Sequence, residues 1–301
     1  MGLLVGDDMV SFSGFINSFR DVTNQTFARD ITNANSTWRR MDDMPLQFDV
    51  THAAAAIVGT KVYLCGGYRG AHPGPHTPLC YLYDNSITPG TGQQWTRFAD
   101  IPNNGTAGAC MVYDATRRTL YYIGGGQRLV PGRPESVDTN NTWKFDFLQP
   151  SSGWVATTSI PYKANHLSAV TAKHLGQERH FIVGGQISEN ESIGNLADVF
   201  EFFATNETYV RRFSMPFGRS HTTISTRAIG CGFIVAGGSV NSINGRKQRT
   251  RNILYYDIPT NNWTSIGDIP TNLATPLVDI HNSGYMYFVN DDGTSRRQIV
   301  V

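Results

Sequence analysis

The sequence predicts an all-β fold in which similar four-stranded antiparallel sheets follow one another along the chain. Three observations support it: a Met/Ile-Pro pair recurs, a glycine doublet follows each of the first four pairs, and an aromatic strand follows each doublet. The 30 glycines and 14 prolines are spread over the whole 301-residue chain, which is typical of many short strands and little helix.

The repeat has a period of 54 to 59 residues, measured between the prolines. After each proline we expect a short apolar strand and then a second strand, which in the first four units ends in the doublet, as in KVYLCGG closing at Gly67. The prolines are Pro45, Pro102, Pro161, Pro216 and Pro270, and the doublets end at Gly67, Gly126, Gly185 and Gly238.

A third strand with alternating aromatic residues follows each doublet, and a fourth begins six to eleven residues later with an indole or a phenol. The third strands are predicted at 81–84, 143–146, 199–202 and 254–257, and the fourth at Trp95, Trp154, Tyr209 and Trp263. One sheet of about 50 residues cannot bury both of its faces, so such sheets stack around an axis and cover one another. The sequence therefore predicts a β-propeller.

The two ends of the chain suggest how the ring closes. The last unit has three predicted strands, at 275–280, 285–289 and 297–301, whereas residues 36–41 around Trp38 carry the fourth-strand pattern alone. We therefore predict five four-stranded blades closed by an N-terminal strand that completes the C-terminal blade. On this interpretation residues 1–35 are an N-terminal extension of unassigned structure and 36–301 form the propeller; the alternative is six blades, with further strands within 1–35.

Together the doublet, the aromatic third strand, the spaced Trp and the Met/Ile-Pro pair resemble the kelch repeat of the galactose oxidase/kelch-like superfamily, over residues 36–301. The chain departs from that pattern at Asn290-Asp291-Asp292, where a fifth doublet belongs, and at Tyr209, where a Trp belongs. Kelch propellers include adhesion modules, cytoplasmic adaptors, sugar-active isomerases and copper radical oxidases, so the resemblance implies a fold and not one activity. The chain has no adjacent His pair, which disfavours the oxidase.

Candidate ligand-binding residues lie in the loops that lead into the first strand and out of the second, because these loops line the mouth of a propeller's channel. Their amide, guanidinium and imidazole groups suit a sugar or a carboxylate-bearing peptide. The candidates are Asp49, His52, Tyr68, Arg69, Gln127, Arg128, Lys163, Asn165, His166, Gln186, Arg219 and His221, with Thr51 beside them.

Three of these candidates, His52, His166 and His221, lie seven, five and five residues after their prolines. Metal binding would require the three imidazoles to converge on one ion. We expect them instead to pack and hydrogen-bond between blades, because a repeated position spreads its copies around a ring. No metal or other cofactor is expected.

Other clusters of charge have a simpler interpretation. Nothing in the spacing of Glu135, Glu189, Glu191 and Asp198 pairs two carboxylates as hydrolysis requires, so we expect solvated loop acids. The basic run 246–251 is expected to be a solvated hairpin loop. With a formal net charge of +1, no field favours nucleic acid or a membrane surface.

The compartment follows from the sequons, because Asn-x-Ser/Thr is the acceptor of N-linked glycans. There are seven, more than this composition would give by chance, and they favour a secreted or extracellular glycoprotein; a cytoplasmic protein is the alternative. No signal peptide and no transmembrane segment is expected in this chain. The sequons begin at Asn24, Asn35, Asn104, Asn140, Asn190, Asn206 and Asn262.

Four cysteines are too few for a disulfide scaffold and lack zinc-site spacing. Cys65 ends one predicted strand and Cys80 begins the next, so a disulfide between them and two separate buried thiols are both left open.

The function favoured by these observations is a monomeric, non-enzymatic binding module that recognises a protein or a carbohydrate at the channel mouth. The alternative is a sugar-active propeller enzyme of the isomerase or mutarotase type, which needs only a few acid/base groups in a polar pocket. A copper radical oxidase and a cytoplasmic adaptor are less favoured.

Overall fold

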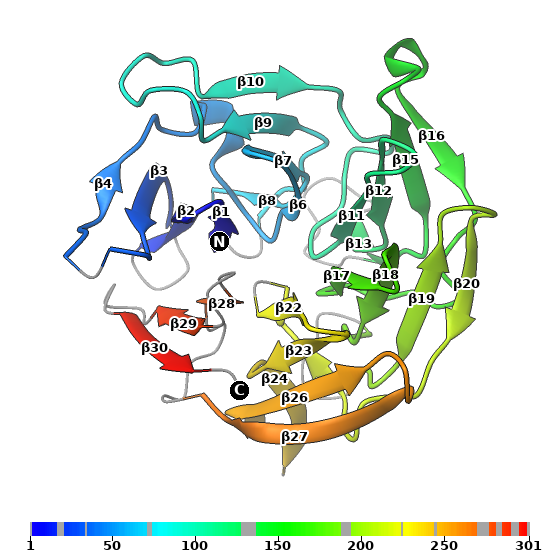
Figure 1. Cartoon of the computed structure of the whole chain (residues 1–301). Helices are drawn as coiled ribbons and strands as arrows, with labels where there is room; N and C mark the ends of the chain where they lie inside the picture. Colours follow the sequence, from blue (N-terminus) through cyan, green and yellow to red (C-terminus); the bar gives the residue numbers. More distant parts are fainter. Residues whose placement is uncertain are drawn as a thin grey trace.

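The protein, studied as a computed structural model, is a ring of β-sheets around a central axis (Figure 1). The structure describes residues 2–16, 21–33, 35–70, 74–127, 137–187, 194–223, 225–243, 246–269, 277–280, 285–289 and 295–299. The helical elements among them are the short 3-10 turns η1 (Leu46–Phe48) and η2 (Pro150–Ser152). None of the described residues forms a helix of the length and hydrophobicity that a membrane crossing requires.

Six antiparallel sheets, here called blades 1 to 6, make up the ring, and the first five have four strands each. Blade 1 is β1(Gly2–Val5), β2(Asp8–Ile16), β3(Asp21–Asp30), β4(Arg39–Arg40); blade 2 is β6(Ala54–Val58), β7(Lys61–Cys65), β9(Cys80–Asp84), β10(Trp95–Phe98); blade 3 is β11(Cys110–Asp114), β12(Thr119–Ile123), β15(Thr142–Asp146), β16(Trp154–Thr157). Blade 4 is β17(Ser168–His174), β18(Gln177–Val183), β19(Val199–Phe203), β20(Thr208–Arg211); blade 5 is β22(Thr226–Ile229), β23(Gly232–Ala236), β26(Asn252–Asp257), β27(Asn262–Asp268); blade 6 is β28(Leu277–Ile280), β29(Tyr285–Val289), β30(Ser295–Ile299). The predicted third and fourth strands of blades 2 to 5 are thereby confirmed.

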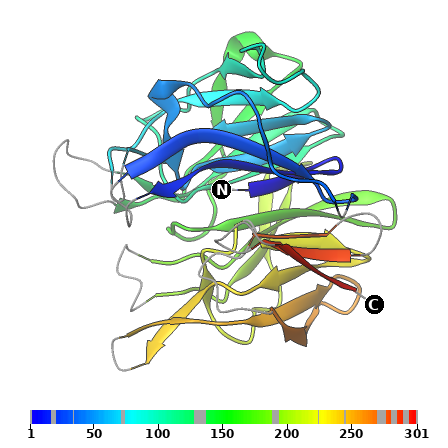
Figure 2. The ribbon, with the colours of Figure 1, turned by 90° about the vertical axis from the view of Figure 1, so that its left-hand side faces the viewer.

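The prediction that an N-terminal strand completes the C-terminal blade is wrong. β4 follows Trp38 and pairs with β3, Phe27 opposite Arg40, so it is the outer strand of blade 1. Residues 1–35 contribute β1, β2 and β3, which makes six blades, the alternative drawn from the sequence. The ring closes instead because β1 lies beside β28, the innermost strand of blade 6 (Figures 1 and 2).

Blade 1 lacks the glycine doublet, which is why the repeat pattern does not reveal it. Its second strand carries a bulge between Phe12 and Gly14, with Ser13 at a positive φ of 54°. A local signal was nevertheless present, because Gly6-Asp7 is a two-residue hairpin loop between Val5 and Asp8 and such loops favour Gly followed by Asp.

The core lies between the blades, and the alternation of each strand divides its side chains between two neighbours. On β12, Leu120 and Tyr122 pack toward blade 2, whereas Tyr121 and Ile123 pack toward blade 4. All four are buried, which explains why this strand is a continuous apolar run. Each blade therefore depends on both neighbours for burial of its faces.

The fourth-strand Trp joins each blade to the loop before it. The indole Nε1–H of Trp95, Trp154 and Trp263 donates to the carbonyl oxygens of Asp42, Ala99 and Phe213 at 2.9, 2.9 and 2.8 Å. Each acceptor lies three residues before the proline of the repeat, so one hydrogen bond recurs in three blades. The spacing of Trp and Met/Ile-Pro in the sequence thus reflects a contact between adjacent sheets.

Replacing Trp154 by Phe is expected to lower the free energy of unfolding by about 1–2 kcal/mol, since it removes the bond to Ala99 and part of the buried ring. Trp143→Phe is the matched control: it lies in the same sheet, half-buried, with no indole hydrogen bond among the described contacts. Chemical denaturation would measure both. Equal losses in the two variants would show that the recurring hydrogen bond contributes nothing.

Candidate functional site

The channel mouth is built by short pairings outside the blades. In four blades the residues that lead into the first strand pair with those that follow the doublet: Thr51 with Tyr68, Ala107 with Gly126, Asn165 with Gln186, and Ser220 with Ser239. The short strands involved are β5(Val50–Thr51), β8(Tyr68–Arg69), β13(Gly126–Gln127), β14(Val137–Asp138), β21(Arg219–Ser220), β24(Ser239–Ile243) and β25(Arg246–Arg249). The two sets of loops predicted to line the mouth are thus adjacent in space.

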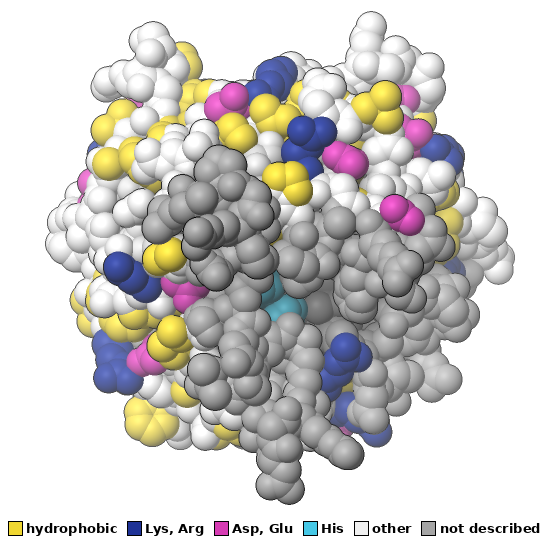
Figure 3. All heavy atoms as spheres, turned by 180° about the vertical axis from the view of Figure 1, so that it is seen from behind, with side chains coloured by type: hydrophobic (Ala, Val, Ile, Leu, Met, Phe, Trp, Pro, Cys, Tyr) yellow, Lys and Arg dark blue, Asp and Glu magenta, His cyan; other side chains and the backbone are white. Residues whose placement is uncertain are grey.

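Four residues occupy one equivalent position next to the axis: His52, Gly108, His166 and His221. All have positive φ, of 58°, 67°, 50° and 61°. Their backbones are linked, because Gly108 N–H donates to His52 O at 2.9 Å and Leu167 N–H donates to Gly108 O at 3.1 Å. This left-handed turn directs the three histidine side chains toward the channel, and Figure 3 shows histidine at the centre of that face.

The three histidines of blades 2, 4 and 5 meet one another. The ring centroids of His166 and His221 are 4.0 Å apart and nearly parallel, and His52 lies 4.9 and 6.3 Å from them with its ring almost perpendicular to both. One ring nitrogen of each lies within 4.8 Å of those of the other two. The expectation that the repeat would keep the three histidines apart was wrong. Equivalent residues of different blades lie close together when their position in the repeat is next to the axis, however far apart the outer strands of those blades are.

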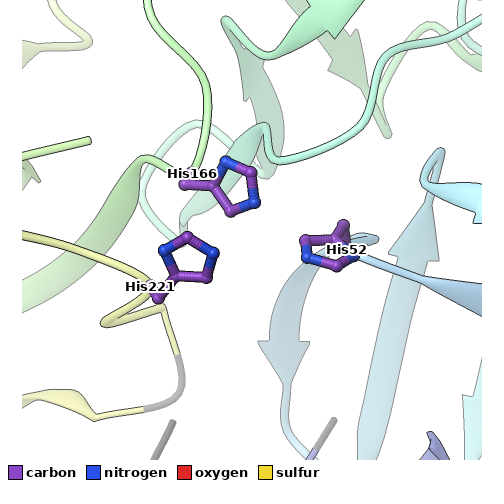
Figure 4. Close-up of side chains that lie close together, drawn as sticks. All are labelled: His52, His166 and His221. Carbon is purple, nitrogen blue, oxygen red and sulfur yellow. The ribbon is translucent and has the colours of Figure 1, made fainter. Parts of the chain in front are cut away.

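Each ring is oriented by the side chain of the residue before it. Nδ1 of His52 lies 3.1 Å from Thr51 Oγ1, Nδ1 of His221 lies 2.9 Å from Ser220 Oγ, and Nδ1 of His166 contacts Asn165 Oδ1. Figure 4 shows the three rings turned toward one another, each with one nitrogen toward the space between them. Since Nδ1 is engaged by its neighbour, the nitrogen facing that space is Nε2.

The hydrogen-bond network fixes the tautomer of two rings. Asn165 Nδ2 donates to Asp138 Oδ1, so Asn165 Oδ1 is the atom facing His166 and can only accept. Ser220 Oγ has one proton, and its shortest bond is to Asn195 Oδ1 at 2.6 Å, so it accepts from His221. Nδ1 therefore carries the proton in both rings, and Nε2 carries a lone pair when the ring is neutral.

The sequence matches no protein-family model and no curated protein. Solved structures do match, in 410 chains. One of them, described as "Structure of YjhT", superimposes with a TM-score of 0.71 at 14% sequence identity. The match covers 98% of this chain and 91% of the YjhT chain. The fold is a kelch-type β-propeller. At this identity the likeness shows the fold alone.

Several candidates stand at the mouth of this kelch propeller, around the three imidazoles. Tyr68 is buried, with its ring 5.5 Å from that of His52, and Asn165 and Gln186 are buried beside His166. Arg69 and Asp49 form an ion pair at 3.5 Å on the half-buried rim.

Arg219, another candidate, does not face the axis. Arg219 is fully buried and donates to the carbonyl oxygens of Val235, Gly237 and Asn252 at 2.8–3.2 Å, so it ties β23 to β26. Burial lowers its pKa to about 9. Lys163 is exposed, Gln127 donates to Asn103 O, and Arg128 lies outside the described residues.

Two polar residues at the mouth escaped the sequence prediction, Asp138 and Asn195, which are only 8% and 6% exposed. They stand four residues before the third strands of their blades, and His76 has the same place before β9. That fixed spacing ahead of the aromatic strand was a usable signal. It identifies a third loop that contributes to the mouth, besides the two that were predicted.

A second group, Asp114, Glu178 and His180, lies between blades 3 and 4. Burial alone would raise the pKa of Asp114, but hydrogen bonds from His180 and Arg117 outweigh it and hold the pKa well below its usual range. Arg117 contacts Asp114 Oδ2 at 3.0 Å. Because Asp114 is already bound by His180 and Arg117, and Glu178 Oε2 accepts from the N–H of Ala115, we assign the group a structural role.

The remaining predictions concern carboxylates, the basic run and two cysteines. Asp198 pairs with Arg211 at 2.5 Å, the basic run forms β25 and pairs with β24, and Glu135, Glu189 and Glu191 are not among the described residues. Cys65 and Cys80 are opposite one another on β7 and β9, and their sulfur atoms are bonded.

The predicted sequons differ in exposure. Asn35, Asn104, Asn206 and Asn262 are exposed, Asn24 and Asn140 are half-buried, and Asn190 lies outside the described residues. Asn24 Nδ2, the atom that would carry a glycan, donates to Met44 O at 3.0 Å. A secreted glycoprotein stays a prediction, with the four exposed asparagines as its best sites.

Proposed function

We propose that this chain is a sugar-active kelch propeller of the mutarotase or isomerase type, with its reacting centre at the three imidazoles of the channel mouth. The observation that carries the proposal is the convergence of Nε2 of His52, His166 and His221 on one small space. Sugar-active isomerases are among the activities that the kelch resemblance implies.

The chemistry of ring opening needs few groups. A base takes the proton of the anomeric hydroxyl while an acid supplies one to the ring oxygen, and a positioned imidazole can do either. A cluster of imidazoles serves this in two ways: its lone pairs accept the proton directly, or they hold a metal ion that polarises the sugar oxygen. In both cases the Nε2 atoms must point to the space between the rings, toward the substrate itself or toward the ion that would bind it, as the preceding side chains arrange here.

The surrounding groups suit a polyhydroxy ligand. Tyr68 and His76, with ring centroids 4.9 Å apart, border the imidazoles, and aromatic surfaces pack against the apolar faces of sugars. The Asp49–Arg69 pair on the rim offers acceptors and donors to hydroxyl groups. We expect the ligand to rest on the imidazoles, since rings 4.0–6.3 Å apart leave no passage for a sugar between them.

The test is exchange between the anomers of reducing sugars, measured by proton NMR with neutral hexoses, N-acetylated amino sugars and acidic sugars. The full chain is expected to accelerate one class, and His166→Asn to reduce that acceleration about 100-fold or more. His174→Asn is the matched control, because His174 ends β17 at the end of the strand opposite to the channel mouth. Unchanged anomer exchange with every class, or equal loss in both variants, would contradict the proposal.

A second candidate is the non-catalytic binding module. It is favoured by the same closure of the axis by the rings, and by a cavity of about 510 Å³ at the outer edge of blades 4 and 5, lined by Arg211, Phe213, Met215 and Trp263 among others. Sugar binding at the mouth without faster anomer exchange would support this candidate over the enzyme.

A further inference from the structure

We infer that His52, His166 and His221 form a binding site for one divalent metal ion of the Zn²⁺ type. The inference is separate from the proposed function: a metal can bind here whether or not a sugar is turned over. It rests on the position of three nitrogens, on the groups that orient them and on the residue at the fourth equivalent position.

The geometry is close to what a metal requires. Bonds of about 2.0–2.1 Å at tetrahedral angles place ligand nitrogens about 3.3–3.4 Å apart, and here the nitrogens lie within 4.8 Å of one another. Binding would draw them together by up to about 1.5 Å and open the stack of His166 on His221, whose rings are inclined by 28°.

The orienting groups match those of metal-bound imidazoles. A ligating His usually donates its other ring N–H to an oxygen, which fixes the tautomer and makes the ligand nitrogen more basic. Thr51, Asn165 and Ser220 provide that oxygen in all three blades, although they are three different residue types. Behind Asn165 lies the buried carboxylate of Asp138, which favours a cation at the site.

Among the described residues, a fourth equivalent position contributes no ligand. It is Gly108, where an added Cβ would lie 2.6 Å from the backbone nitrogen of His166, so a side chain cannot enter from blade 3. Three imidazoles with one open coordination place are typical of reactive zinc sites, where water or a substrate oxygen completes the shell. Within the part of the chain that the structure describes, the cluster consists of imidazoles, which prefer Zn²⁺, Cu²⁺ or Ni²⁺ to Mg²⁺ or Ca²⁺.

The test is titration of the metal-stripped full chain with Zn²⁺ by calorimetry, and with Co²⁺ by visible absorption. We expect one ion per chain and the intense absorption of four- or five-coordinate Co²⁺. His52→Asn, His166→Asn and His221→Asn should each weaken Zn²⁺ binding about 100-fold or more, while His174→Asn leaves it unchanged. Asn is the chosen replacement because it tolerates the positive φ of these positions.

Thermal unfolding of each variant without metal distinguishes the loss of a ligand from the loss of structure. If a variant does not fold, the Co²⁺ spectrum of the unmodified chain still tests the inference. Absence of one-to-one binding, a six-coordinate Co²⁺ spectrum, or equal weakening in His174→Asn would overturn the inference. The two proposals fail separately. If the metal-stripped chain still accelerates anomer exchange and binds no Zn²⁺, only the metal site is contradicted. If the chain binds Zn²⁺ tightly but does not accelerate anomer exchange, only the proposed enzyme activity is contradicted.

Discussion

Replacing Gly67 by Ala is expected to lower the free energy of unfolding by about 3 kcal/mol, the combined effect of an unfavourable φ and a backbone collision. Gly67 has a φ of 102°, and an added Cβ would lie 2.4 Å from Thr51 O and 3.0 Å from Ala53 N. Neither atom is the end of a flexible side chain, so the strand leading to His52 would have to shift. Denaturant unfolding measures the loss.

Gly59→Ala is the matched control, because Gly59 also has positive φ, of 63°, but nothing lies within 4 Å of the added atom. This variant should lose only the conformational part, about 1 kcal/mol. The difference between the two variants measures the close approach between the doublet and the mouth together with the extra cost of a φ of 102° over one of 63°. Equal losses would mean that glycine is needed in the doublets only for its positive φ and not for the close packing next to the axis.

The doublet also explains how much of the fold the sequence could predict. Gly67 N–H donates to Thr106 O, Gly125 N–H to Ala164 O and Gly185 N–H to Arg219 O, each at 2.9 Å and each in the next blade. A contact repeated between successive sheets constrains the same residue in each repeat, so the period is visible in the sequence. Blade 1 has Ser13 and a bulge at this place, and its strands were missed for that reason.

The candidate site was predictable in its members but not in its geometry. His52, His166 and His221 were identified from their spacing to the prolines. Whether their side chains meet depends on how wide the central channel is at the level of these residues, and no local sequence pattern encodes that width. Arg219 shows the opposite case, since it occupies a mouth-like position but turns into blade 5 to bond backbone carbonyls. Whether a side chain follows the loop to the axis is decided by the neighbouring sheet.

Replacing Glu201 by Gln is the second large effect that we expect, a loss of about 3–5 kcal/mol. Glu201 is 1% exposed and binds two cations: Arg179 through Nε and Nη2 at 2.5 and 2.6 Å, and Arg212 through Nε at 2.7 Å. Neutralising it leaves two guanidinium groups side by side on blade 4 with the shared carboxylate gone. Half-buried arginines still reach water, so the loss should lie toward the lower end of this range.

The matched control is Asp198→Asn in the same blade, where Arg211 makes a single contact and its side chain is 64% exposed. That pair should contribute less than about 1 kcal/mol, because solvent screens it. Unfolding at low and high salt would separate the two cases: added salt should leave the Glu201→Gln loss nearly intact and remove most of the Asp198→Asn loss. A Glu201→Gln loss as small as that of the exposed pair would mean that both arginines swing out to solvent, and that the buried carboxylate stabilises blade 4 no more than an exposed ion pair does.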